Sequence, residues 1–247
     1  MTVELILNHK SIRAWKETPI EEKLMETLFE AANRTSTSNG MQNASIIRVK
    51  DSKKREKISE VAGQKYVMES PELLIFIVDN YRNYRIVEEQ GQKENFANDT
   101  DRFFQGFTDA CLMAQNVTIA AESMGLGIVY YGSILNDARK IIEILELPKN
   151  TFPVVGLGLG YPNQNPELKP RMSIKSKVFT DRYEVKDNYL EELKSYDEEM
   201  SRYYDLRNPN QSLDPFTTQV AKKNSAQMLH RSELFEIIKE QGFNVSY

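Results

Sequence analysis

Blocks of apolar and polar positions alternate along this chain and predict helices and strands in turn. Thr18, Pro19 and Glu21 form a helix-start signal, so a helix is expected from Thr18 to about residue 33. Apolar runs, some of them nearly continuous, predict strands in a buried sheet. The expected strands are residues 45–49, 72–78, 128–131 and 152–160, and two further helices are expected at residues 52–61 and 137–145.

Two longer segments contrast with each other. Residues 103–124 are apolar on most sides of a helix, which is typical of a helix buried in a core or at a subunit interface. Residues 80–101 are polar and charged with no clear period, and are expected to form a mobile segment.

The last quarter of the chain has a different character. Helices are expected at residues 188–204 and 231–241, the latter closed by Gly242, with a loop at residues 208–216 between them. Because this tail has few strands of its own, it is expected to wrap the core or a partner subunit. The prediction is therefore one domain over residues 1–247, with a C-terminal extension over about residues 180–247.

Composition narrows the function classes. The 247 residues are 40% hydrophobic and 28% charged, which fits a folded protein with a core, and the net charge of −4 argues against nucleic acid as a partner. No apolar run approaches the length of a membrane span, and the first residues lack signal-peptide features. The single cysteine, Cys111, cannot form an internal disulfide. A cytoplasmic protein is expected.

The candidate chemistry lies in two basic clusters far apart in sequence, His9-Lys10-Ser11-Ile12-Arg13 and Lys169-Pro170-Arg171. Each combines cations and hydrogen-bond donors of the kind that a phosphate group binds. If the clusters meet in space, they form a site for a phosphorylated cofactor. Taken alone, the first cluster is equally well read as a solvated basic turn, and the second is more often a solvated surface run.

The sequence lacks the motifs of other common nucleotide-binding sites and of metal sites. Gly156-Leu157-Gly158-Leu159-Gly160 lacks the G-x-G-x-x-G spacing and opens no helix, and no phosphate-binding P-loop is present. The glycines suggest instead a close approach of another backbone or a ligand. With two histidines, His9 and His230, and one cysteine, a metal site is not expected.

The motifs in combination are more specific than any one alone. The chain resembles the nitroreductase/flavin reductase family, and most closely its NADPH-dependent, oxygen-insensitive nitroreductase (FMN reductase) branch. The resemblance runs from about Val3 to Gly242 and is weak in residues 80–101 and 205–230. It rests on H-x-S-I-R near the start, the helix signal T-P-I, the Ser/Thr-rich loop with Gln42, Gly63-Gln64-Lys65, Ala114-Gln115-Asn116, Ala120 to Gly127, and Pro166 to Arg171.

The resemblance implies an α+β fold, with a central mixed sheet flanked by helices and a long buried helix at a homodimer interface. FMN would bind at that interface, and the implied FMN-binding residues are His9, Lys10, Ser11, Arg13, Ser36, Ser38, Gln42, Gln64, Tyr131, Gly132, Ser133, Lys169 and Arg171. The loop carrying Ser36, Ser38 and Gln42 would come from the partner subunit. Lys10 stands where relatives often have arginine, and Ser133 where they often have glycine.

The implied activity is hydride transfer from NADPH through FMN to an electron-poor acceptor, such as a nitroaromatic, a quinone, free flavin or an azo compound, by a ping-pong mechanism. No side chain is implied as catalytic; the backbone of Gly132 would lie near N5 of the flavin. Arg207 and Arg231 are candidates for binding NADPH, and are equally well read as solvated arginines at helix ends. The alternatives are a non-catalytic FMN-binding sensor or carrier, and an interaction module in which the basic clusters never meet.

Overall fold

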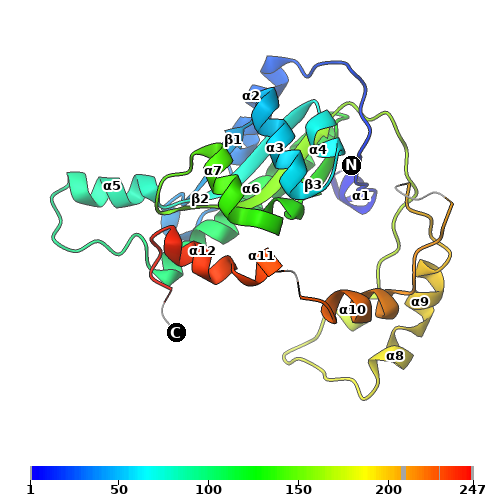
Figure 1. Ribbon diagram of the computed structural model, residues 1–247. Helices are drawn as coiled ribbons and strands as arrows, with labels where there is room; N and C mark the ends of the chain where they lie inside the picture. Colours follow the sequence, from blue (N-terminus) through cyan, green and yellow to red (C-terminus); the bar gives the residue numbers. More distant parts are fainter. Residues whose placement is uncertain (1, 207–209, 228, 246–247) are drawn as a thin grey trace. The chain divides into compact units, whose positions relative to one another are not determined.

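A computed structural model describes residues 2–206, 210–227 and 229–245. The chain divides into two compact units, unit 1 with residues 1–165 and 228–247, and unit 2 with residues 166–227 (Figure 1). Residues 229–245, near the end of the chain, belong to unit 1 and not to unit 2.

The core of unit 1 is a sheet of four strands in the order β1-β2-β4-β3. They are β1 (Ala44–Arg48), β2 (Glu72–Asp79), β3 (Gly127–Tyr131) and β4 (Thr151–Gly160). Each neighbouring pair is antiparallel, with Phe76 opposite Val155 at the centre. The expected mixed sheet is therefore antiparallel in these strands, and a parallel bridge joins Ser11 to Ile128 at the β3 edge. β2 has the unbroken apolar sequence of a strand covered on both faces, as predicted.

Helices surround this sheet in unit 1. They are α1 (Thr2–Leu7), α2 (Glu22–Asn33), η1 (Ser38–Gly40), α3 (Ser52–Ala62), α4 (Tyr66–Glu69), α5 (Tyr81–Glu89), α6 (Thr100–Ser123), η2 (Gly132–Asp137), α7 (Ala138–Leu145), α11 (Leu229–Ser232) and α12 (Leu234–Glu240). The long helix α6 packs on all four strands and on α2. Its buried face carries small residues such as Gly106, Ala110 and Ala114, which let it approach the sheet closely. The α+β class and the long helix are thus as predicted.

Two local predictions in the first half of the chain were wrong. The helix expected from Thr18 begins at Glu22, because the preceding segment is held extended: the Lys16 N–H donates to the Tyr161 carbonyl (2.8 Å), and Ile20 is buried in the core. Tertiary contacts outweigh the local capping signal. In residues 80–101, where the sequence shows no clear period and no helix was expected, the structure has helix α5.

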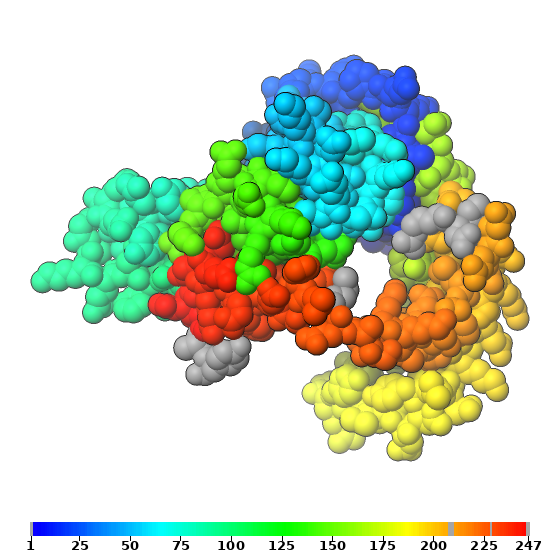
Figure 2. All heavy atoms as spheres, in the orientation of Figure 1, coloured from blue at the N-terminus to red at the C-terminus, as the bar shows by residue number. Residues whose placement is uncertain are grey.

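Asparagine side chains hold α5 and the loop that follows it. The amide of Asn80 donates to the Ala97 carbonyl (2.9 Å), and that of Asn95 donates to the Tyr84 carbonyl (2.9 Å). An ion pair between Arg85 and Glu89 (3.1 Å) lies along the exposed surface of the helix. Figure 2 shows α5 and its loop standing out from the rest of unit 1.

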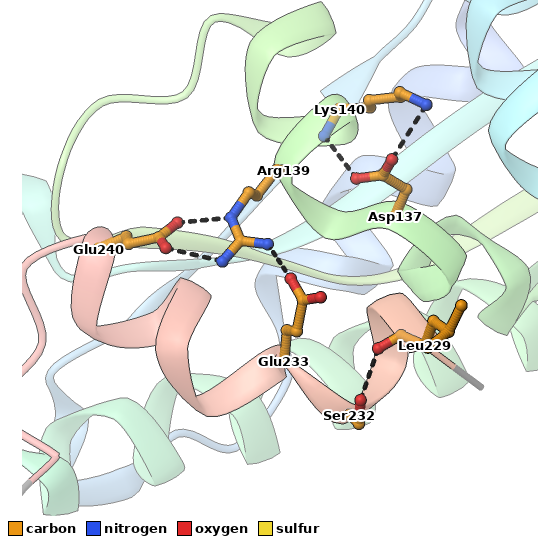
Figure 3. Close-up of polar contacts among 7 residues, drawn as sticks. All are labelled: Asp137, Arg139, Lys140, Leu229, Ser232, Glu233 and Glu240. Atoms are coloured by element: carbon orange, nitrogen blue, oxygen red, sulfur yellow. Dashed lines mark hydrogen bonds and ion pairs between the residues drawn. The ribbon is translucent and has the colours of Figure 1, made fainter. Parts of the chain in front are cut away.

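The C-terminal segment is bound firmly to unit 1. The guanidinium of Arg139 donates two hydrogen bonds to Glu240 (both 2.7 Å) and a further bond to Glu233 (Figure 3). The side chain of Gln241 donates to the Thr151 carbonyl (3.1 Å), and the ring of Phe243 packs edge-on against Phe103. The single helix expected over residues 231–241 is divided into α11 and α12 at Glu233. Gly242, with φ +91°, follows the end of α12 as predicted. These contacts explain why the chain's end belongs to unit 1.

Unit 2 consists of short helices joined by loops: η3 (Ile174–Ser176), α8 (Tyr189–Glu192), α9 (Lys194–Met200) and α10 (Phe216–Asn224). The single helix expected over residues 188–204 is broken at Leu193, and α10 was not predicted. The rings of Tyr196 and Phe216 pack 5.2 Å apart, and the Asp197 carboxylate accepts the Thr217 N–H (2.9 Å). Among the described residues, none of the helices combines the length and the apolar character that spanning a bilayer requires.

Candidate functional site

The first basic cluster lies on an extended segment beside the edge strand β3. The Ile12 N–H donates to the Ile128 carbonyl (2.7 Å), and the Ile12 side chain is buried. Because side chains alternate along extended backbone, anchoring Ile12 in the core sets Ser11 and Arg13 on the other side, where both are half-buried.

Each basic side chain of this cluster has a defined environment. His9 Nδ1 lies 2.6 Å from a carboxylate oxygen of Glu122 on α6, and Lys10 donates to the Asn165 side chain (2.8 Å). Arg13 differs, because its Nε is buried and has no hydrogen-bond partner among the described residues. A buried donor without a partner costs about 1–3 kcal/mol, so a bound anion that accepted from it would recover that cost. The cluster therefore fits a phosphate group.

The loop carrying Ser36, Ser38 and Gln42 is tied through its backbone. Asn83 of α5 donates to the Met41 carbonyl (2.9 Å), and the guanidinium of Arg82 donates to the carbonyl of Gln42, which has φ +52°. In the part of the chain that the structure describes, the side chains of Ser36, Ser38 and Gln42 form no hydrogen bond. The loop thus presents side chains that are available to a ligand.

A second group forms around the turn after β3. The Ser133 hydroxyl donates to the side-chain oxygen of Gln64 (3.0 Å), and Arg231 of α11 donates to the Gly132 carbonyl (3.0 Å) and to Asn136 (3.3 Å). Gly132 itself is exposed. The structure therefore brings together Gln64, Gly132, Ser133 and Arg231, which were singled out separately in the sequence.

Tyr131 is placed differently from its neighbours. Its side chain is fully buried, its hydroxyl donates to the Tyr66 carbonyl (3.2 Å), and burial raises the pKa of the phenol above its ordinary value. The ring lies against Gly158 of β4, where a Cβ atom would collide with it. The close approach expected at the glycine-rich strand is thus made by a side chain, and Tyr131 can offer a cofactor only its backbone.

The second basic cluster belongs to unit 2. Lys169 and Arg171 are both exposed, and Arg171 donates to the carbonyls of Lys169 (3.1 Å) and Pro170 (3.2 Å). Because the two clusters lie in different units, their meeting stays a prediction. The NADPH-binding candidate Arg207 lies outside the described residues.

Charged residues within the apolar helix α6 are the part of the site that sequence analysis missed. Glu122 pairs with His9, and the buried Asp109 accepts hydrogen bonds from the loop at residues 38–43. The sequence did contain a signal for these residues, namely a charged side chain inside an otherwise apolar helix. Within the described ranges, no group of three or more His, Cys, Asp or Glu residues could hold a metal ion.

Comparison with known proteins identifies the family. Residues 6–161 match the model of the nitroreductase family, and residues 169–246 match the model of the nitroreductase family, C-terminal domain. The NADPH-dependent oxidoreductase of Staphylococcus saprophyticus is 38% identical over 97% of this chain and 96% of its own length. The FMN reductase (NADPH) of Bacillus subtilis is 35% identical over 98% of each chain.

A solved structure agrees with these matches. The NADPH:FMN oxidoreductase from Vibrio harveyi, complexed with NAD+, superposes with a TM-score of 0.87 at 34% identity, covering 99% of each chain. Matches of this extent cover both compact units. The chain therefore belongs to the nitroreductase family.

Proposed function

We propose that this protein is an FMN-dependent oxidoreductase that uses NADPH as electron donor and reduces electron-poor small molecules. The names of its relatives support the cofactor and the donor. The observation in the molecule that carries the proposal is the half-buried Arg13, whose buried Nε has no partner, beside a histidine and a lysine on the same segment. FMN bound there would supply hydride transfer, and the protein would supply binding and orientation.

Different residues of unit 1 would bind different parts of FMN. His9, Lys10, Ser11 and Arg13 would hold the phosphate and ribityl chain through charge-assisted hydrogen bonds. Gln64, fixed by Ser133, would bond the polar edge of the flavin ring, and the exposed backbone of Gly132 would face its reactive edge. Lys169 and Arg171 of unit 2 would complete the phosphate clamp, and positive charge near the ring would stabilise negative charge that develops on it.

We further propose that the donor and the acceptor occupy the same open site in turn, which gives ping-pong kinetics, with nitroaromatics, quinones, azo compounds and free flavin as acceptor classes. Arg231 is the described candidate for contacting NADPH. Its bonds to Gly132 and Asn136 place it at the turn proposed for the flavin, so it would act close to the ring.

The active form is proposed to be a homodimer in the cytoplasm, with Ser36, Ser38 and Gln42 reaching the partner's flavin. Two large apolar side chains of α6, Phe104 and Leu112, are 53% and 46% exposed, and they lie eight positions apart on one stripe of the helix. Burying this stripe against a second copy would remove apolar surface from water. Residues 1–247 are proposed to form a single FMN-binding domain. A monomer by light scattering at micromolar concentration would contradict the dimer.

The test is spectroscopic. Purified protein is incubated with FMN, desalted, and its visible spectrum is recorded before and after NADPH is added without oxygen. Retained flavin bands that bleach at once would support the oxidoreductase. Retained bands that persist would favour a flavin sensor or carrier, and the absence of bound flavin would contradict the proposed cofactor. Steady-state NADPH oxidation with a quinone or nitroaromatic then measures turnover.

A further inference from the structure

A buried carboxylate on α6 holds the loop that carries Ser36, Ser38 and Gln42. Asp109 is fully buried, at 0% exposure. One of its oxygens accepts the Ser38 N–H (3.0 Å), and the other accepts the Asn43 N–H (3.2 Å). The two bonds bracket the tight part of the loop, where Asn39 and Gln42 both have positive φ.

The type of side chain at position 109 follows from these two bonds. A buried carboxylate is costly unless hydrogen bonds compensate it, and no cation of the described residues pairs with Asp109. A carboxylate has two oxygens that accept and none that donate, so it can take both N–H groups. An asparagine in its place would turn a donor toward one of them.

Further residues of α6 fit the same loop. Asn116, seven positions after Asp109 and so on the same side of the helix, donates to the Thr35 hydroxyl (2.9 Å) at the start of the loop. At Gly106, three positions before Asp109, an added Cβ would lie 2.7 Å from the Asn43 carbonyl oxygen. Helix α6 therefore contacts the loop at three places. Asn116 binds the start of the loop, and Asp109 binds the backbone on either side of its turn. Gly106 leaves space for the loop's backbone at Asn43.

We propose that Asp109, supported by Asn116, is a positioning residue for flavin binding. It fixes the backbone of residues 35–43 so that the unbonded side chains of Ser36, Ser38 and Gln42 are held ready for the ligand. The gain is pre-organisation: the loop is ordered before binding, and FMN does not have to order it. This inference rests on the proposed function and assigns to α6 a role beyond packing.

The test compares Asp109→Asn with wild type. In the absence of flavin, amide hydrogen exchange at Ser38 and Asn43 is expected to be about tenfold faster in the variant, because each N–H loses or weakens its acceptor. Core amides of β2 and the oligomeric state are expected to be unchanged. In a fluorescence titration, FMN affinity is expected to fall about tenfold or more, mainly through faster dissociation.

Asp51→Asn is the matched control, since the Asp51 carboxylate also accepts a backbone N–H, that of Lys54 (2.9 Å), at the start of α3. It is expected to leave FMN affinity unchanged. FMN affinity within twofold of wild type in folded Asp109→Asn would overturn the positioning role. Equal acceleration of exchange in β2 and the loop would also overturn it, because the residue would then act on overall stability.

Asn116→Ala covers the case in which Asp109→Asn does not fold. It removes the bond to Thr35 from a half-buried position, and is expected to weaken FMN binding about threefold and to speed exchange in the loop alone. Unchanged affinity and exchange would overturn the inference. A wild-type protein that binds no FMN would instead contradict the proposed function. In that case, hydrogen exchange at Ser38 and Asn43 in the flavin-free protein would still measure whether Asp109 holds the loop.

Discussion

The two basic clusters look alike in sequence but are built differently in the structure. In the first, Ile12 anchors the segment to β3, Glu122 holds His9, and Arg13 keeps a buried donor without a partner. In the second, Lys169 and Arg171 are exposed, and the bonds of Arg171 are to carbonyls of its own cluster. The first cluster is therefore pre-organised by the fold of unit 1, and we expect it to contribute more of the phosphate affinity.

The most severe test of this difference is Arg13→Ala. Loss of two charge-assisted hydrogen bonds, each contributing about 1.5–3 kcal/mol, is expected to weaken FMN binding about 100-fold or more. Fluorescence titration measures the dissociation constant, with Lys57→Ala, an exposed cation on α3, as the control. Retention of wild-type affinity would show that the first cluster does not bind the phosphate.

Arg171→Ala is expected to have a smaller but still clear effect, about a tenfold loss of FMN affinity, because an exposed arginine loses more of its binding energy to ordering and solvent screening. The FMN affinity of the double variant, Arg13→Ala with Arg171→Ala, is then compared with the losses in the two single variants. Non-additive losses would indicate that both arginines contact one phosphate, and additive losses would mean that the two clusters act at separate sites.

Glu122→Gln tests whether the pre-organisation of the first cluster matters in itself. The substitution keeps the shape and removes the charge that faces His9, so FMN affinity is expected to fall about threefold to tenfold. Glu60→Gln, an exposed change on α3, is the control. An effect as large as that of Arg13→Ala would mean that His9, and not Arg13, is the dominant phosphate ligand.

The smallest expected effect concerns the segment that carries Arg231. The hydrogen bond from Arg139 holds the pKa of Glu240 below its ordinary value of 4.5. The contact therefore stabilises the folded state above about pH 4.5, and the stabilisation is lost as the pH falls through the lower, folded-state pKa. Since the pair is exposed, hydrogen exchange of residues 229–245 is expected to accelerate only about twofold to threefold on acidification. Arg139→Gln is expected to remove this pH dependence. A pH dependence that persists in the variant would mean that other carboxylates cause it.

Much of the fold could be predicted from local pattern. The strands, the charged helix α3 and the apolar helix α6 follow from hydrophobic periodicity, because burying one face requires that spacing whatever the neighbours are. The start of α2 could not be predicted, since the burial of Ile20 and the bond from Lys16 to Tyr161 overrode a good capping signal. Helix α5 was missed because the asparagine bonds that hold it and its loop join residues 11 and 17 positions apart.

The sequence by itself determined the residue types of the candidate site and, through their order and spacing, the family. It could not determine which side chains remain available to a ligand. Tyr131 and Arg13 looked equally suitable, yet packing against Gly158 buries the first and leaves the second with an unpaired donor. Asp109, Glu122 and Arg231 acquire their partners from segments more than 60 residues away. Contacts of that range depend on how helices and strands pack together, and only the tertiary structure decides them.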